Sequence, residues 1–134
     1  MPLLHAARLV GSGGLSAETF RQADAIDLSL EGSGDMTFGG EVPTLTARLD
    51  GSGNMRLRGS ATTVVLGLEG SGDLRASDLS AATADIRLGG SGSLAATVTG
   101  ASRITLDGSG NIDLFGGGAI ESSSLSGSGQ LRTH

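Results

Sequence analysis

The chain has 134 residues, of which 24 are glycine, and it contains three phenylalanines but no cysteine, tryptophan or tyrosine. Its net charge is −5 without any cluster of basic residues, which argues against nucleic acid or an anionic membrane surface as a partner. The lack of cysteine excludes disulfides and thiolate metal sites, and no run of about 18 apolar residues is present to span a membrane.

A Gly-Ser-Gly tripeptide recurs along the whole chain and divides it into similar units. The intervals between successive tripeptides are 21, 19, 19, 20, 18 and 19 residues, so seven tripeptides bound six repeats. The tripeptides begin at Gly11, Gly32, Gly51, Gly70, Gly90, Gly108 and Gly127. Such a period is typical of repeat architectures, in which each unit buries its apolar face only against its neighbours.

Apolar residues alternate with polar ones on both sides of each tripeptide, which is the period of a β-strand. In chain order, each repeat is predicted to be a strand, a Gly-Ser-Gly corner, a second strand and a return segment. The return segments, such as 18–25, 39–44 and 77–83, hold all the length variation and are expected to be tolerant loops. A leucine stands two residues before every corner and forms the predicted core ladder: Leu9, Leu30, Leu49, Leu68, Leu88, Leu106 and Leu125.

The predicted fold is therefore all-β. It is a single-stranded parallel β-helix of about six coils, each of 18–21 residues, and residues 1–134 form one solenoid domain. Stacking would bring equivalent positions about 4.8 Å apart and join the leucines into a continuous core. We expect a right-handed coil, the hand of nearly all parallel strand connections.

The corner glycines have two interpretations. Successive N–H groups in a glycine turn can bind phosphate, but no Lys-Ser/Thr and no helix pattern follows the tripeptides. A repeated sharp corner also needs backbone angles or close approaches that only glycine permits cheaply, and this structural role is favoured. The predicted structural corners are Gly11, Gly13, Gly32, Gly34, Gly51, Gly53, Gly70, Gly72, Gly90, Gly92, Gly108, Gly110, Gly127 and Gly129.

Acidic residues precede several corners and would stack into an acidic column: Glu31, Asp50, Glu69 and Asp107. Glycine-rich repeats with aspartate bind Ca²⁺ in some shorter-period solenoids. However, Ca²⁺ needs six or more converging oxygens, and a single-file column offers fewer. We therefore predict no metal and no cofactor.

The sequence also disfavours an enzyme. The two histidines, His5 and His134, lie near opposite ends of the chain, and no nucleophile or metal motif is present. Stacked acids such as Glu31 and Asp50 could cleave a glycoside, yet the chain lacks the aromatic platforms of most sugar-binding grooves. We predict no catalytic residues, and a carbohydrate-active enzyme is the least favoured alternative.

The recurring unit resembles the bacterial auto-transporter adhesin head, GIN domain family, from about Arg8 to Arg132. The resemblance rests on segments such as Gly70-Ser-Gly-Asp-Leu-Arg-Ala and Ala84-Asp-Ile-Arg-Leu. It implies a parallel β-helix, export to the envelope or cell surface, and an adhesive or structural role without known catalytic residues. Family members usually carry a leader and a further N-terminal β-rich portion, which this chain lacks.

Two non-catalytic functions follow as hypotheses. The first is an adhesin-like module that binds a glycan or protein ligand through its side faces or return segments. The second is end-to-end self-assembly, because neither end of the repeat array shows a polar cap and open strand edges can pair with another copy. The candidate end-to-end interface comprises Leu3, Leu4, Leu9, Leu125 and Leu131.

Overall fold

The computed structural model describes residues 6–11, 13–20, 26–117 and 119–133. The strands are β1 (Ala6–Gly11), β2 (Gly14–Phe20), β3 (Ile26–Gly32), β4 (Asp35–Gly51), β5 (Asn54–Gly70), β6 (Asp73–Gly90), β7 (Ser93–Val98), β8 (Ala101–Gly108), β9 (Asn111–Phe115), β10 (Ala119–Ser126) and β11 (Gln130–Thr133). All of their pairings are parallel. The predicted all-β solenoid of about six turns is confirmed.

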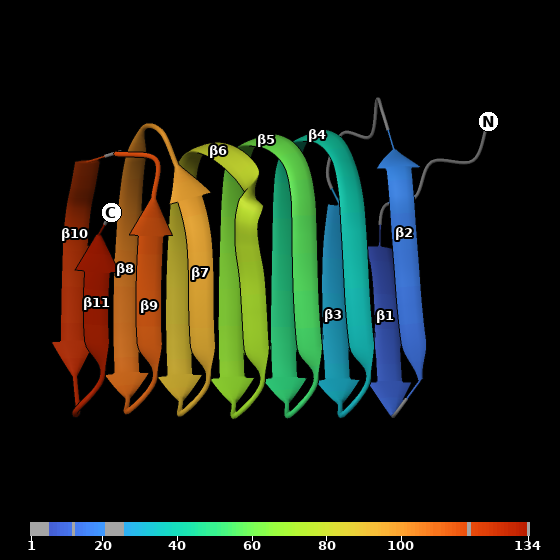
Figure 1. Cartoon of the computed structure of the whole chain (residues 1–134), viewed down its shortest axis with the longest axis horizontal. Helices are drawn as coiled ribbons and strands as arrows, with labels where there is room; N and C mark the ends of the chain where they lie inside the picture. Colours follow the sequence, from blue (N-terminus) through green and yellow to red (C-terminus); the bar gives the residue numbers. More distant parts are fainter. Residues whose placement is uncertain (1–5, 12, 21–25, 118, 134) are drawn as a thin grey trace.

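Each coil is a flattened loop with two sides (Figure 1). The chain leaves a corner, runs up one side, bends over at the return and descends on the other side to the next corner. The post-corner face consists of β2, β7, β9, β11 and the first halves of β4, β5 and β6. The pre-corner face consists of β1, β3, β8, β10 and the second halves of β4, β5 and β6.

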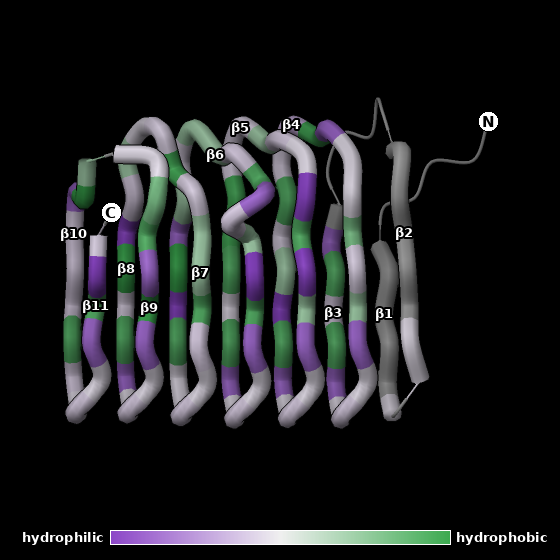
Figure 2. The backbone as a smooth tube through the Cα atoms, viewed as in Figure 1, coloured by the Kyte–Doolittle hydropathy of each residue, from purple (hydrophilic) through white to green (hydrophobic). Residues whose placement is uncertain are grey.

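The leucine ladder lies at the centre of the core. Each rung pairs with the next in register, as Leu30 does with Leu49 and Leu49 with Leu68. From Leu30 to Leu106, every rung is at most 1% exposed. The inward residues of the post-corner face, such as Met36 and Phe38, are buried as well. The tube in Figure 2 shows the resulting alternation of hydrophobic and hydrophilic positions along the strands.

The return segments differ from the expected loops, because in β4, β5 and β6 the ladder continues through them. Val42 pairs with Ala61, Ala61 with Ala81, and Ala81 with Val98. All four side chains are buried. The returns thus close the core along the edge opposite the corners, and pairing satisfies their backbone groups.

Length variation is absorbed at or next to this bend, as the sequence predicts. Between β5 and β6 the register shifts between Arg56 and Arg58, where β6 carries one extra residue. Between β6 and β7 it shifts between Ala76 and Ser80. Because the shifts stay outside the core ladder, the leucine register is preserved from coil to coil.

The corner at Gly51-Ser52-Gly53 shows why both of its glycines are needed. Gly51 has a φ of 123°, a conformation that side chains rarely adopt. Gly53 has no such angle, but a Cβ there would overlap the carbonyl oxygen of Gly34 in the preceding coil. One glycine therefore permits the turn, and the other permits the coils to stack at strand spacing.

We predict opposite results for alanine at two glycines of the same coil. Gly72→Ala would place a Cβ against the Gly53 carbonyl and should lower the free energy of unfolding by about 2 kcal/mol or more. Gly67→Ala meets only ordinary contacts and should leave it unchanged or raise it by up to about 1 kcal/mol. Urea unfolding of both variants measures the difference. Equal stabilities would contradict the stacking role of the corner.

Candidate functional site

The backbone donors of the corners are used between coils. The N–H groups of Ser52 and Gly53 both donate to the carbonyl oxygen of Gly32, at 3.1 and 3.2 Å, and Asn54 N–H donates to Gly34 at 3.3 Å. The same pattern recurs at the following corners. These N–H groups hold neighbouring coils together, which favours the structural interpretation over a phosphate cradle.

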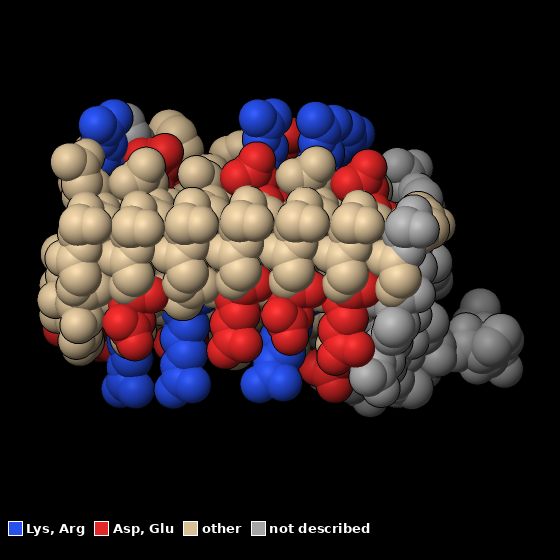
Figure 3. All heavy atoms as spheres, turned by 90° about the horizontal axis from the view of Figure 1, so that it is seen from below, with Lys and Arg blue, Asp and Glu red and all other residues tan. Residues whose placement is uncertain are grey.

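Charged side chains instead gather on the two flat faces. Figure 3 looks onto the ridge formed by the corners, with acidic side chains along both flanks and arginines projecting farther out. On the pre-corner face, Glu31, Asp50 and Glu69 follow one another in register. On the post-corner face, Asp35 and Asp73 are separated by Asn54. Each face therefore presents an acidic row beside the ridge and arginines beyond it.

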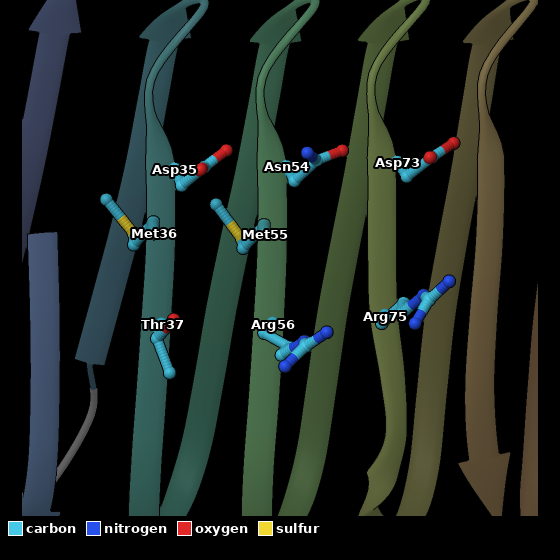
Figure 4. A pocket seen from close by; sticks show the side chains of 8 residues that line it. All are labelled: Asp35, Met36, Thr37, Asn54, Met55, Arg56, Asp73 and Arg75. Carbon is cyan, nitrogen blue, oxygen red and sulfur yellow. The ribbon is translucent and has the colours of Figure 1, made fainter. Parts of the chain in front are cut away.

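A shallow depression of about 410 Å³ lies on the post-corner face. Figure 4 shows Asp35, Asn54 and Asp73 pointing the same way from three successive coils. One step farther from the corner, Arg56 and Arg75 occupy paired positions on neighbouring strands. Like charges at paired positions repel, and Asp35 and Asp73 line the same depression as these arginines.

The pre-corner face carries two larger depressions, of about 690 and 490 Å³. Both are lined by Ser29, Arg48, Gly67 and Arg87. The first lies toward the acidic row, and the second extends away from the corner to Val65. Val65 is 37% exposed although it is a large hydrophobic residue. Arginines, carboxylates and one exposed valine therefore meet at the middle of this face.

The acidic column lies on the pre-corner face in single file and is interrupted, because Gly89 stands between Glu69 and Asp107 in the register. Within the described ranges, no three His, Cys, Asp or Glu side chains form a grouping that could hold a metal ion. The candidate glycosidase pair, Glu31 and Asp50, occupies paired positions on β3 and β4. His5 and His134 lie outside the described residues.

The structure describes only some of the residues of the candidate end-to-end interface. Leu3 and Leu4 lie outside the described residues, and Leu9 is described only as a backbone position of β1. At the other end, Leu125 in β10 is 53% exposed, and Leu131 in β11 is partly buried. The ladder that is closed inside the solenoid is thus open at this last described coil.

Sequence reasoning missed the depressions around Gly67. It did not place Gly67 between Arg48 and Arg87. The signal was available, because these three residues all stand three positions before their corners.

In the described part of the chain, no helix is both long and apolar enough to cross a membrane.

A comparison with family models gives one match. The family described as "Putative auto-transporter adhesin, head GIN domain" matches residues 1–118, which confirms the resemblance seen in the sequence. The match runs through β9, and β10 and β11 follow it. Searches of curated proteins and of solved structures each found no significant match. Since the match spans most of its length, the chain belongs to the auto-transporter adhesin head family of GIN domains.

Proposed function

We propose that this chain is a non-catalytic adhesive module that acts outside the cytoplasm, at the bacterial envelope or surface. The family supports both the adhesive role and the location. The observation that carries the proposal is the pair of flat faces, on which outward side chains of successive coils stand in register. A surface of this kind can bind an extended ligand at many points without moving.

The rigidity of the faces follows from the ladder beneath them. β4 and β5 pair without interruption of register from Asp35–Asn54 to Gly51–Gly70. A side chain such as Arg48 therefore stands on a backbone held by hydrogen bonds on both edges. Preorganised side chains lose less conformational entropy on binding, which favours recognition by a fixed surface.

Charge reversal on one face at a time tests the adhesive role. We expect the purified chain to bind members of a printed array of glycans and extracellular-matrix proteins. Arg48→Glu with Arg87→Glu should reduce that binding at least tenfold. Arg56→Glu with Arg75→Glu is the matched control on the opposite face and should reduce it less. All four arginines are exposed, so circular dichroism should remain unchanged.

Three results would contradict this proposal. The first is equal binding by both double variants and the wild-type chain. The second is an absence of binding to any member of the array. The third is release of shortened saccharides from the bound glycans, which would make the protein an enzyme.

Labelling of intact cells with an antibody against the chain tests the proposed location. A signal that is seen only after lysis would contradict a location outside the cytoplasm.

A second candidate function, end-to-end assembly, is favoured by the exposure of Leu125. Leu125 pairs with Leu106 in the ladder, as Leu9 pairs with Leu30 near the other end. If β10 of one copy stacked on β1 of another, Leu125 of the first copy would lie beside Leu9 of the second, and the leucine ladder would continue from one copy into the next. Such a contact joins two different surfaces, so it propagates into a filament.

A charge placed on this end should stop assembly without unfolding the chain. We expect Leu125→Lys to convert filaments, seen by electron microscopy of the wild-type protein, into discrete particles. Val65→Lys is the matched control, because Val65 is also an exposed hydrophobic residue but lies in the middle of a face. Filaments of equal length from Leu125→Lys, or discrete particles from the wild-type protein, would contradict this candidate function.

A further inference from the structure

Gly67 is a glycine that its backbone does not require. It lies within β5 on the pre-corner face, and its φ is outside the range that disfavours side chains. A Cβ there would meet only Arg48 Cγ at 3.7 Å and the Ala47 carbonyl oxygen at 3.9 Å, both ordinary contacts. Glycine inside a strand costs stability and packs nothing. Neither the backbone conformation nor close packing therefore requires glycine at this position.

The missing side chain opens a cup at the centre of the face. Gly67 pairs with Arg48 on one side and with Arg87 on the other. Val65, the next outward residue of β5, extends the floor, and Asp85 pairs with it from β6. The two depressions of this face share Gly67 as a lining residue. We call this feature, bounded by these five residues, the Gly67 cup.

The two guanidinium groups at the cup are available to a ligand. Arg48 and Arg87 are both exposed, and their strands are separated by two inter-strand spacings, roughly 10 Å. Among the described residues, the ion pair that forms on this face joins Arg103 and Glu121, and neither arginine of the cup takes part in one. Long arginine side chains on either side of an open floor can both reach an anion seated over Gly67.

The carboxylates around the cup limit what that anion can be. On the corner side of the arginines the lining includes Glu31, Asp50, Glu69 and Asp107, and on the other side it includes Asp27 and Asp85. A polyanion such as a nucleic acid or a highly acidic peptide would be repelled by them. A ligand with one carboxylate and several hydroxyl donors satisfies both sets of groups, because carboxylates accept hydrogen bonds from hydroxyls.

From this complementarity we propose that the Gly67 cup binds a single hexuronic acid residue of a polysaccharide whose neighbouring sugars are neutral. The sugar carboxylate accepts hydrogen bonds from Arg48 and Arg87 across Gly67. Its hydroxyls donate to Asp85 and Glu69, and the apolar face of its ring covers Val65. The inference deepens the proposed adhesive function and rests on it, since it names the ligand class and the face that binds.

The decisive variant fills the cup without harming the fold. Gly67→Thr adds a β-branched side chain where a Cβ fits, so the melting temperature should stay the same or rise. Gly14→Thr is the matched control, because Gly14 is also an exposed strand glycine with an open Cβ position and lies on the post-corner face. A third variant, Arg87→Gln, removes one guanidinium and keeps the side chain polar.

The probes are a trisaccharide with one glucuronate between two neutral hexoses, the matching trisaccharide with glucose in place of the glucuronate, and a glutamate hexapeptide, titrated by calorimetry into the full chain. We expect the glucuronate trisaccharide to bind, and the neutral trisaccharide and the peptide to bind at least tenfold more weakly. Gly67→Thr and Arg87→Gln should each weaken binding of the glucuronate trisaccharide at least tenfold, a loss typical of a removed charged hydrogen bond. Gly14→Thr should bind as the wild-type chain does.

Several outcomes would overturn the inference: no binding of the glucuronate trisaccharide, equal affinity for the neutral trisaccharide, tighter binding of the peptide, or unaltered binding by Gly67→Thr. The array experiment separates these failures from failure of the adhesive function. If the wild-type chain and Gly67→Thr adhere equally to array members while neither binds the glucuronate trisaccharide, the adhesive function stands and the Gly67 cup is not its site. If nothing is bound in either experiment, both proposals fail.

Discussion

The close contact between one corner and the next is the constraint on which the rest of this structure depends. A single carbonyl, that of Gly32, accepts N–H groups from two residues of the following coil, and this is possible only because no Cβ stands in the way. Once the corners stack at strand spacing, each strand residue before and after a corner lies beside the equivalent residue of the neighbouring coil. The leucine ladder, the acidic row and the arginines of both faces are consequences of that one register.

Much of this organisation could be predicted from the sequence, because it is encoded locally. Leu68, two residues before a corner, and Leu74, four after, alternate with polar neighbours in a pattern that needs no knowledge of distant residues. The inward returns could not be predicted in the same way. Val42 and Ala81 follow bends and inserted residues that break the alternation, so only the paired strands reveal that they share a buried column.

The candidate site was harder to predict for a different reason. In the sequence, Gly67 stands outside the Gly-Ser-Gly tripeptides, but nothing local shows whether its missing side chain leaves an opening. The distinction lies in what surrounds the missing Cβ. At Gly53 that space is filled by backbone of the preceding coil, whereas at Gly67 it is open to solvent between two arginines. To recognise the Gly67 cup, one must know which residues of the two neighbouring coils lie beside Gly67. The sequence gives the repeat, and the structure gives this pairing.

The direction of the coil-to-coil hydrogen bonds has a mechanical consequence. They run along the solenoid axis, and β1 and β11 lie at opposite ends of that axis (Figure 1). Tension between these two strands therefore pulls each terminal coil away along the direction of its hydrogen bonds. These hydrogen bonds then break one after another, and the terminal coils detach before the inner ones. A released coil of about 19 residues lengthens the chain by roughly 60 Å. A solenoid held between two surfaces would thus lengthen stepwise under load while the remaining coils keep their faces intact.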